Sequence, residues 1–342
     1  MASAQPCTSL AAVRTEARFS GVANAAGHYE SFYLKAAAPE GGKALWIRHT
    51  IHQRPGAEPT CSIWLTAFDA GRGAPRATKA TYESERLSVP DGAYVRIGDA
   101  EIGPGRAEGT VETEALNARW KLGFEDRHEP LRHLPSAWMY NGKLPKTKLL
   151  SPHPGALWSG EVEIDGETFT LDGWPGMVGH NWGAEHAERW IWLHGADFEG
   201  GSPGDYVDIG AGRIKLGPWT TPWIANGMLV LDGQAHRLGG LGKTYGTEID
   251  AKPGRCELTV AGKGVTLKGS FSGPLEQFVG WIYADPDGGK HNTINSSIAD
   301  LELRVERPGK KHAHIRLAGG AAYELGMRES DHGVAMQPYS DG

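Results

Sequence analysis

Alternation of apolar and polar residues constrains this chain more than any other feature of its sequence. Apolar side chains occupy every second position of the segments Asn117–Glu125 and Asp300–Glu306, and polar or small residues fill the positions between them. The segments Glu161–Asp165 and His312–Leu317 repeat the pattern. A period of two is typical of antiparallel strands that bury one face and expose the other. The chain is therefore predicted to consist mainly of such strands.

Short turn sequences separate the alternating segments. Asp-Gly or Pro-Gly pairs begin at Asp91, Asp165, Asp232, Asp287 and Pro308. Glycine adopts the positive φ that a tight hairpin turn needs. Helical periodicity is scarce, and the best candidate is one short turn near Ala184–Glu188. Many short strands joined by tight turns predict an all-β fold, either a sandwich or a barrel.

Length and proline content predict two domains. A chain of 342 residues corresponds to about two domains of roughly 150 residues each. A proline-rich stretch at Pro130–Pro154 interrupts the strands, because proline is excluded from central strands. A second dense turn region is expected at Asp172–Gly183. The boundary is placed near residue 175, which gives an N-terminal barrel at 1–175 and a C-terminal barrel at 176–342.

Composition excludes several classes of function. The formal net charge is −6 and no basic run exceeds Lys310-Lys311, so nucleic acid is not an expected partner. No apolar run approaches the ~20 residues of a membrane helix, and the N-terminus lacks the pattern of a secretory signal. The three cysteines, Cys7, Cys61 and Cys256, are far apart and odd in number. They fit reduced thiols in the cytoplasm, which is the predicted location.

One central segment resembles a known family. Gly179-His180-Asn181-Trp182-Gly183 leads into an aromatic-rich run that ends at His194. This is similar to the central signature of the hydroxyneurosporene synthase (carotenoid hydratase) superfamily, to which tocopherol cyclases and Diels–Alder-type cyclases look related. Glu30–Leu34 and Trp46–Thr50 resemble the first barrel strands of that family. The resemblance implies two lipocalin-like antiparallel β-barrels side by side, with a hydrophobic ligand bound near their junction.

One position departs from that signature. The hydratases carry an Asp, a candidate proton donor, where this chain has Gly179. Asn181 and Gly183 match the pattern. The acid chemistry that the resemblance implies therefore cannot be assigned to residue 179.

The aromatic run after Gly183 has its own chemical implication. If it forms a strand, Trp190, Trp192 and His194 share one face. Were that face to point into a barrel, it would form an aromatic wall with one titratable group. Tryptophan faces stabilise a developing cation by ~0.5–2 kcal/mol each, and histidine exchanges a proton near neutral pH. The alternative is that both tryptophans are packed core and that the histidine is inert.

Two sets of candidate site residues follow from this region. The candidate acid–base groups are His180, Glu185, His186 and His194. The candidate substrate-binding residues are Asn181, Trp182, Trp190 and Trp192. The three histidines are close in sequence, but their spacing fits no metal-binding motif, so no metal site is predicted. Glu185 could instead pair with Arg189 if the intervening turn is helical.

Two functions of different classes fit these observations. The first is a cofactor-independent hydratase, cyclase or isomerase that moves protons on an isoprenoid or polyene-like metabolite in a tryptophan-rich pocket. The second is a non-catalytic lipocalin-like carrier of a lipid or pigment, which the loss of the acid at Gly179 favours. In both cases the partner is a hydrophobic small molecule, and transient contact with a membrane could serve to collect it. The substrate and the oligomeric state stay open.

Overall fold

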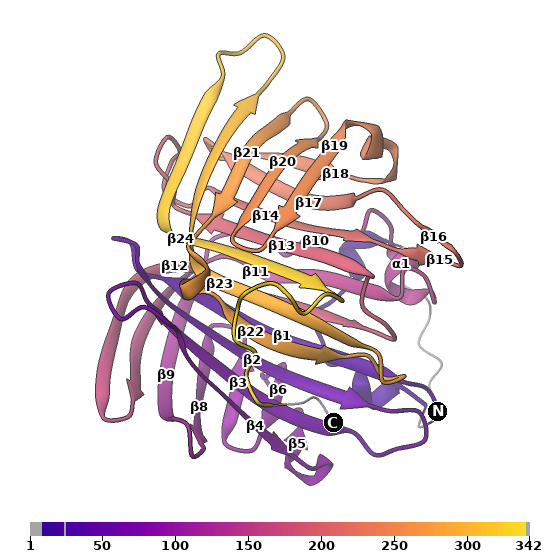
Figure 1. Cartoon of the computed structure of the whole chain (residues 1–342), viewed down its shortest axis with the longest axis vertical. Helices are drawn as coiled ribbons and strands as arrows, with labels where there is room; N and C mark the ends of the chain where they lie inside the picture. Colours follow the sequence, from indigo (N-terminus) through magenta and orange to yellow (C-terminus); the bar gives the residue numbers. More distant parts are fainter. Residues whose placement is uncertain (1–8, 24, 340–342) are drawn as a thin grey trace.

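Two large antiparallel sheets form almost all of the regular structure (Figure 1). The computed structural model describes residues 9–23 and 25–339. The first sheet uses the N-terminal half of the chain and the second uses the C-terminal half, and they lie against each other. The predicted all-β, lipocalin-like architecture is confirmed.

The first sheet has twelve strands and curls into a half-barrel. Its order is β4-β3-β2-β1-β12-β11-β9-β8-β7-β6-β5, and the short strand β10 pairs with β11. The strands are β1 His28–Ala37, β2 Lys43–Gln53, β3 Thr60–Asp69, β4 Arg76–Tyr82, β5 Leu87–Ser88, β6 Val95–Ile97, β7 Ala100–Gly103, β8 Arg106–Glu112, β9 Asn117–Asp126, β10 Leu131–Arg132, β11 Thr147–Ile164 and β12 Glu167–Gly183.

The second sheet has ten strands and nearly closes into a barrel, with a bridge between Leu238 of one edge strand and Gly262, which lies next to the other edge strand's partner. Its order is β18-β17-β14-β13-β24-β23-β21-β20-β19, with β22 paired to β23. A separate small hairpin joins β15 to β16. The strands are β13 Arg189–Ala196, β14 Tyr206–Arg213, β15 Lys215–Leu216, β16 Trp219–Thr220, β17 Ile224–Leu231, β18 Gln234–Gly239, β19 Thr247–Lys252, β20 Arg255–Ala261, β21 Thr266–Ser272, β22 Val279–Ala284, β23 Lys290–Glu306 and β24 Ala313–Met327.

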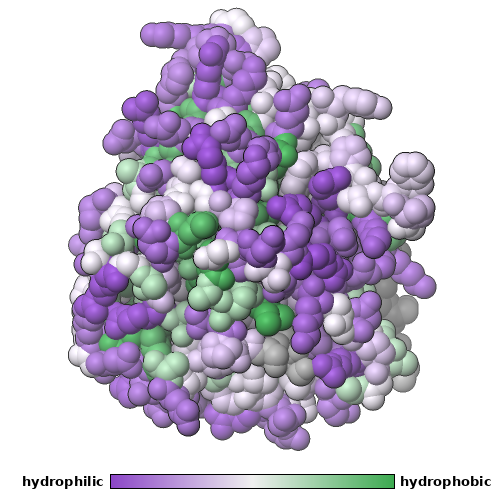
Figure 2. All heavy atoms as spheres, viewed as in Figure 1, coloured by the Kyte–Doolittle hydropathy of each residue, from purple (hydrophilic) through white to green (hydrophobic). Residues whose placement is uncertain are grey.

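Helices are short and peripheral. The α-helix α1 covers Ala137–Asn141. The 3-10 turns are η1 Leu10–Ala12, η2 Phe19–Gly21, η3 Ser84–Arg86, η4 Leu241–Gly246 and η5 Leu275–Gln277. Within the described residues, no helix is long and apolar enough to cross a membrane. The face shown in Figure 2 is mainly hydrophilic, with hydrophobic side chains in small separate patches.

The period-two pattern corresponds to real strands. The alternating segment at Asn117–Glu125 lies in β9, where Ala118, Trp120 and Leu122 are buried in the core of the first sheet. The Asp165-Gly166 pair joins β11 to β12 with positive φ at both residues, as a tight hairpin requires. Free, buried thiols are found at two of the three cysteines, Cys61 and Cys256, whereas Cys7 lies outside the described residues.

The predicted interruption at Pro130–Pro154 is wrong in its second half. Strand β11 begins at Thr147 and runs through Pro152 and Pro154. Its register against β12 shifts within Leu150–Ala156. Such bulges leave ladder positions without a hydrogen bond, so a residue without an N–H group is tolerated there.

The predicted turn region at Asp172–Gly183 is also wrong, because β12 runs without a break to Gly183. The glycines there permit close packing instead of turning the chain. A Cβ on Gly176 would lie 2.0 Å from the backbone oxygen of Lys35 in the neighbouring strand. The expected helical turn at Ala184–Glu188 is a non-helical connection between the two sheets.

Candidate functional site

A layer of buried polar and aromatic side chains fills the junction between the two sheets. In β13, Ile191 and Leu193 belong to the core of the second sheet. Trp190, Trp192 and His194 alternate with them and face the first sheet. The three side chains share one face, as predicted, and of the two alternatives for that face the one in which it lines a barrel interior is not found. This face lies between the sheets because the other face of β13 supplies the barrel core.

A cleft of about 240 Å³ lies at one end of this layer. Both sheets contribute to its apolar walls, through Leu157, Pro175, Ala196 and Leu317. Arg127 and Asp197 line the cleft and form an ion pair 2.9 Å apart. Cavities of roughly 150 Å³ hold benzene, so this cleft is large enough for a small organic molecule.

Lys35 is the buried charged group that lines this cleft. It projects from β1, its residue is 1% exposed, and its ammonium group donates to the backbone carbonyl of Gly320 on β24. No carboxylate of the described residues lies within ion-pair distance of it. Burial lowers the pKa of Lys35 to about 7. At neutral pH the amine is therefore partly unprotonated and can accept or donate a proton.

A buried carboxylate on β14 supplies negative charge to the layer. Asp208 accepts hydrogen bonds from Trp192 Nε1 at 3.2 Å and from Ser151 Oγ at 2.6 Å. His133 Nε2 lies 3.4 Å from it. Burial alone would raise the pKa of Asp208, but His133, His194 and Ser151 together outweigh burial and lower it. Asp208 is therefore charged, and it fixes the orientation of the Trp192 ring.

His194 is held as a neutral imidazole. Its Nε2 donates to the backbone carbonyl of Pro154 at 2.9 Å, and its Nδ1 has no partner. Burial, reinforced by the nearby charge of Lys35, lowers the pKa of His194 to about 4. This arrangement matches the inert alternative for His194 better than the acid–base one.

Gly179 lies beneath an aromatic ring in the middle of the layer. A Cβ at this position would be 2.2 Å from Cζ of Tyr33. The Tyr33 ring meets Trp192 edge-on, with 5.2 Å between ring centroids. The Tyr33 ring occupies the space that an acidic side chain at position 179 would need. Glycine is therefore required at this position by the packing of Tyr33.

A second buried carboxylate joins two histidines at the other end of the layer. Asp285 accepts from His186 Nδ1 at 2.7 Å and from His291 Nε2 at 3.1 Å. The His186 ring stacks on Tyr29 at 3.9 Å and on Trp190 at 5.2 Å. Burial would raise the pKa of Asp285, but the two histidines outweigh it and lower that pKa. Burial lowers the pKa of His186, so Asp285 is charged and His186 is neutral.

A third carboxylate, Glu324 of β24, lies between these two ends. It accepts from Trp190 Nε1 at 2.9 Å, from the Tyr283 hydroxyl at 3.1 Å and from Asn295 Nδ2 at 3.3 Å. The Arg48 guanidinium stacks over the Tyr283 ring at 4.1 Å. These three hydrogen bonds satisfy Glu324 and fix the Trp190 ring, whereas Arg48 Nη1 and Asn295 Oδ1 are buried without a hydrogen-bond partner.

His180 and Trp182 face the interior of the first sheet, away from this layer. His180 Nε2 donates to Glu30 at 2.7 Å, and its ring stacks on Trp182 at 4.4 Å. Glu30 also accepts from the backbone N–H groups of Arg18 and Phe19, both at 2.9 Å. Burial lowers the pKa of His180, so this cluster is a charged Glu30 that anchors the N-terminal segment.

Acid should weaken this anchor. Burial would raise the pKa of Glu30, but the hydrogen bonds from His180 and His28 lower it to about 2, against 4.5 in the unfolded chain. A depressed carboxyl pKa contributes stability above pH 4.5 that is lost as the pH falls towards 2. Glu30→Gln is expected to remove on the order of 3 kcal/mol at pH 7 and to flatten this acid limb. Urea unfolding between pH 2 and 7 measures both effects, and an unchanged limb contradicts the assignment.

The remaining candidates lie at the edge of the layer. Glu185 is partly exposed and pairs with Lys146, so the expected partnership with Arg189 is not formed. Asn181 faces the second sheet and accepts a hydrogen bond from Ser31 Oγ. The eight candidates therefore occupy three environments: the first-sheet interior, the rim and the layer between the sheets.

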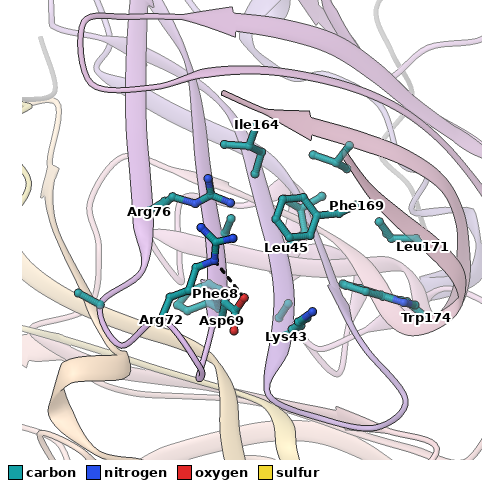
Figure 3. A pocket seen from close by; sticks show the side chains of 14 residues that line it. Lys43, Leu45, Phe68, Asp69, Arg72, Arg76, Ile164, Phe169, Leu171 and Trp174 are labelled. Atoms are coloured by element: carbon teal, nitrogen blue, oxygen red, sulfur yellow. Dashed lines mark ion pairs between the residues drawn. The ribbon is translucent and has the colours of Figure 1, made fainter. Parts of the chain in front are cut away.

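A second pocket lies in the first sheet (Figure 3). Its apolar wall is formed by Leu45, Ile164, Phe169, Leu171 and Trp174, and charged side chains such as Arg72 surround it. Its free volume of about 30 Å³ corresponds to one or two water molecules. None of Trp182, Trp190 and Trp192 lines this pocket or the cleft between the sheets.

Sequence reasoning missed the charged residues of the layer. Lys35, Asp208, Asp285 and Glu324 were not candidates, because they are far apart in the chain and belong to no motif. One local signal exists: Lys35 and Glu324 are single charged residues within apolar or small strand-like runs. Such a residue must be buried on one of the two faces and therefore needs a specific role.

Comparison with known proteins supports the fold. No family model matches the chain. An uncharacterized protein of Mycobacterium tuberculosis, named Rv0493c in strain H37Rv and MT0513 in strain CDC 1551, is 26% identical over 308 residues. The match covers 87% of this chain and 89% of that protein. The relationship therefore extends over both sheets.

Two solved structures share the architecture. An AttH-like protein from Nitrosomonas europaea aligns with a TM-score of 0.53 and 14% identity, covering 88% of this chain and 92% of that one. Kievitone hydratase from Nectria haematococca aligns with a TM-score of 0.50 and 10% identity, covering 93% and 95%. At these identities the likeness establishes the fold alone.

Proposed function

We propose that this chain is a cofactor-independent acid–base enzyme, of the hydratase, cyclase or isomerase type, whose substrate binds in the cleft between the two sheets. The observation that carries the proposal is Lys35, a buried amine that lines this cleft without a carboxylate partner. A lysine in such a place is costly to keep for packing alone, because methionine would fill the same volume without a charge to desolvate.

The amine suits proton transfer. A general acid–base group works best when its pKa is close to the working pH, and burial lowers the pKa of Lys35 to about 7. Lys35 is almost fully buried at the wall of the cleft, and this lack of contact with water strengthens charge interactions with its amine. Asp208 lies near enough to raise the pKa of His194, so it adds negative charge that favours a cationic transition state at this end of the layer.

The cleft also limits the substrate. Scaled from benzene in roughly 150 Å³, a volume of about 240 Å³ holds on the order of ten heavy atoms. A short isoprenoid or a similar apolar metabolite fits within this volume, whereas a whole carotenoid would have to extend out of the cleft. That a hydratase shares this fold supports the reaction class, although the substrate of that enzyme has no bearing on this one.

A binding protein without turnover is the second candidate. Two observations favour it: Gly179 lies where the hydratase signature has its acid, and His194 has its donor engaged by the Pro154 carbonyl. In that case Lys35 would serve to hold a polar group of the ligand. The two functions differ in whether the bound compound changes.

The test follows metabolites in heavy water. The purified chain is incubated in D₂O with a small-molecule extract of its host cell, and the products are followed by mass spectrometry. We expect at least one metabolite to gain or lose water or to take up deuterium, with a rate limb near pH 7. Lys35→Met and Lys35→Arg should both abolish the change, since arginine stays charged.

Lys148→Met provides the matched control. Lys148 is also buried and also donates to a backbone carbonyl, that of Pro145, but it lies outside the cleft. Turnover by the wild type that survives Lys35→Met contradicts the role proposed for Lys35, and the absence of any turnover by the wild type contradicts the enzyme proposal. A compound that co-purifies with the wild-type chain and never changes indicates the carrier instead.

A further inference from the structure

We propose that His186, Asp285 and His291 form a binding site for one divalent transition-metal ion, with Zn²⁺ as the reference ion. Each residue offers one ligand atom, and these atoms all lie within 4.8 Å of one another. The three residues come from separate parts of the chain: the connection between β12 and β13, the turn after β22, and β23. The sequence predicts no metal site, because the partners of His186 lie about a hundred positions further along.

The donor set matches zinc chemistry. Two imidazole nitrogens and one carboxylate oxygen are ligands that zinc accepts with its fourth position left for water. Tetrahedral zinc with bonds of about 2.0–2.1 Å holds its ligand atoms about 3.4 Å apart. His186 Nδ1 and Asp285 Oδ1 are 2.7 Å apart, so this pair must open by about 0.7 Å, whereas any pair near the 4.8 Å limit of the cluster must close. The ion would replace the hydrogen atoms that now join Asp285 to the two rings.

The ligands are held in place before any ion arrives. The His186 ring is stacked against Tyr29 and Trp190, and Trp190 also meets the His291 ring at 4.9 Å. The backbone N–H of Asp285 donates to the Gly289 carbonyl at 2.7 Å, which fixes the turn.

Two features limit the affinity. His186 Nε2 and His291 Nδ1, the outer nitrogens, have no hydrogen-bond partner. Metal-binding histidines usually have such partners, and losing them weakens metal binding about 10–100-fold. Arg328 also lies 3.9 Å from Asp285 and carries charge of the same sign as the ion. The site should therefore bind Zn²⁺ with a micromolar rather than a nanomolar Kd.

This site is separate from the proposed chemistry at Lys35. Tyr29, which stacks on His186, precedes Lys35 by six residues in β1, or about 20 Å at ~3.3 Å per residue. An ion here would tie the connection between the sheets to β22 and β23. Its expected effect is on stability, because a ligand that binds only the folded chain raises the free energy of unfolding.

The experiment uses the full chain after treatment with a chelator. Calorimetric titration with ZnCl₂ is expected to show one ion per chain at micromolar Kd, and Zn²⁺ should raise the Tm. CoCl₂ should give the visible absorption of a four-coordinate site. His291→Gln and Asp285→Asn should each weaken binding at least tenfold, while His314→Gln, which changes an exposed histidine of β24, leaves it unchanged.

The outcomes separate cleanly. Binding that is equally strong in the wild type, His291→Gln and Asp285→Asn places the ion on the surface and overturns the proposal. The absence of binding to the wild type also overturns it and leaves a hydrogen-bonded His–Asp–His network. Should Asp285→Asn fail to fold, His291→Gln decides, because it removes a single hydrogen bond.

Discussion

Replacing Lys35 with methionine is expected to make the protein more stable at pH 7 while removing the proposed activity. In the unfolded chain the lysine pKa is 10.5, and in the folded chain burial lowers it to about 7. At about 1.4 kcal/mol for each pH unit, this difference corresponds to a cost on the order of 5 kcal/mol. Methionine leaves the Gly320 carbonyl without its donor, which costs about 1–3 kcal/mol. The net gain is therefore about 2–4 kcal/mol.

The free energy of unfolding is also expected to depend on pH in a direction that follows from the lowered pKa of Lys35. Between pH 7 and 10.5 the unfolded chain binds a proton that the folded chain does not, so stability rises with pH across this window. Below pH 7 both states bind the proton and the full cost is present. Lys35→Met should remove the rise, and urea unfolding at pH 7, 8.5 and 10 measures it.

Lys148→Met tests whether the effect is specific to the cleft. Lys148 is less deeply buried and outside the cleft, so its replacement should leave both activity and most of the pH dependence in place. A destabilised Lys35→Met variant would show that the amine contributes to packing, and the functional role proposed for it would then lose its physical basis.

Gly179→Asp, which restores the acid of the hydratase signature, is expected to destabilise the chain by at least about 3 kcal/mol. The new Cβ would lie 2.2 Å from Cζ of Tyr33, and overpacking a buried site alone costs about 1–3 kcal/mol. The carboxylate would add a buried charge with no donor prepared for it. Thermal and urea unfolding of the variant measure the loss.

A pair of variants identifies the clash as the cause. Gly242→Asp serves as the control, because a Cβ at Gly242 meets nothing within 4 Å, and its cost should stay within about 0.5 kcal/mol. In the double variant with Tyr33→Ala, the cost of Gly179→Asp should shrink, which gives a favourable coupling energy between positions 179 and 33. Additive losses would mean that Tyr33 is not what excludes the acid.

The period-two alternation of apolar and polar residues predicts the architecture because a strand buries one face and exposes the other to solvent. That rule identified β9 and the hairpin at Asp165-Gly166. The rule failed at β11 and β12, because proline at position 152 and glycine at position 176 are residues that usually interrupt a strand. In the fold, proline lies at a bulge, and glycine lets the backbone of Lys35 approach closely. Local sequence does not reveal these tertiary causes.

The candidate site was predictable only in part. The sequence placed Trp190 and Trp192 on one face but could not tell which of two neighbouring spaces that face borders. Lys35 and Gly320, which meet in the cleft, are 285 residues apart, so only the packing of the two sheets brings them together. The family signature pointed to the connection between the sheets, yet the cleft is at the opposite end of the layer.

Because the walls of the cleft come from both sheets, ligand affinity and the association of the two halves are thermodynamically linked. A compound that binds in the cleft strengthens the junction by RT ln(1 + [L]/Kd). A substitution that loosens the junction enough to populate an open state also weakens ligand binding, even where it touches no ligand, because the apparent Kd rises as the closed fraction falls. The buried carboxylate Asp208 accepts hydrogen bonds from Ser151 of the first sheet and from Trp192 of the second, so it is expected to act on affinity from a distance by holding the two sheets together.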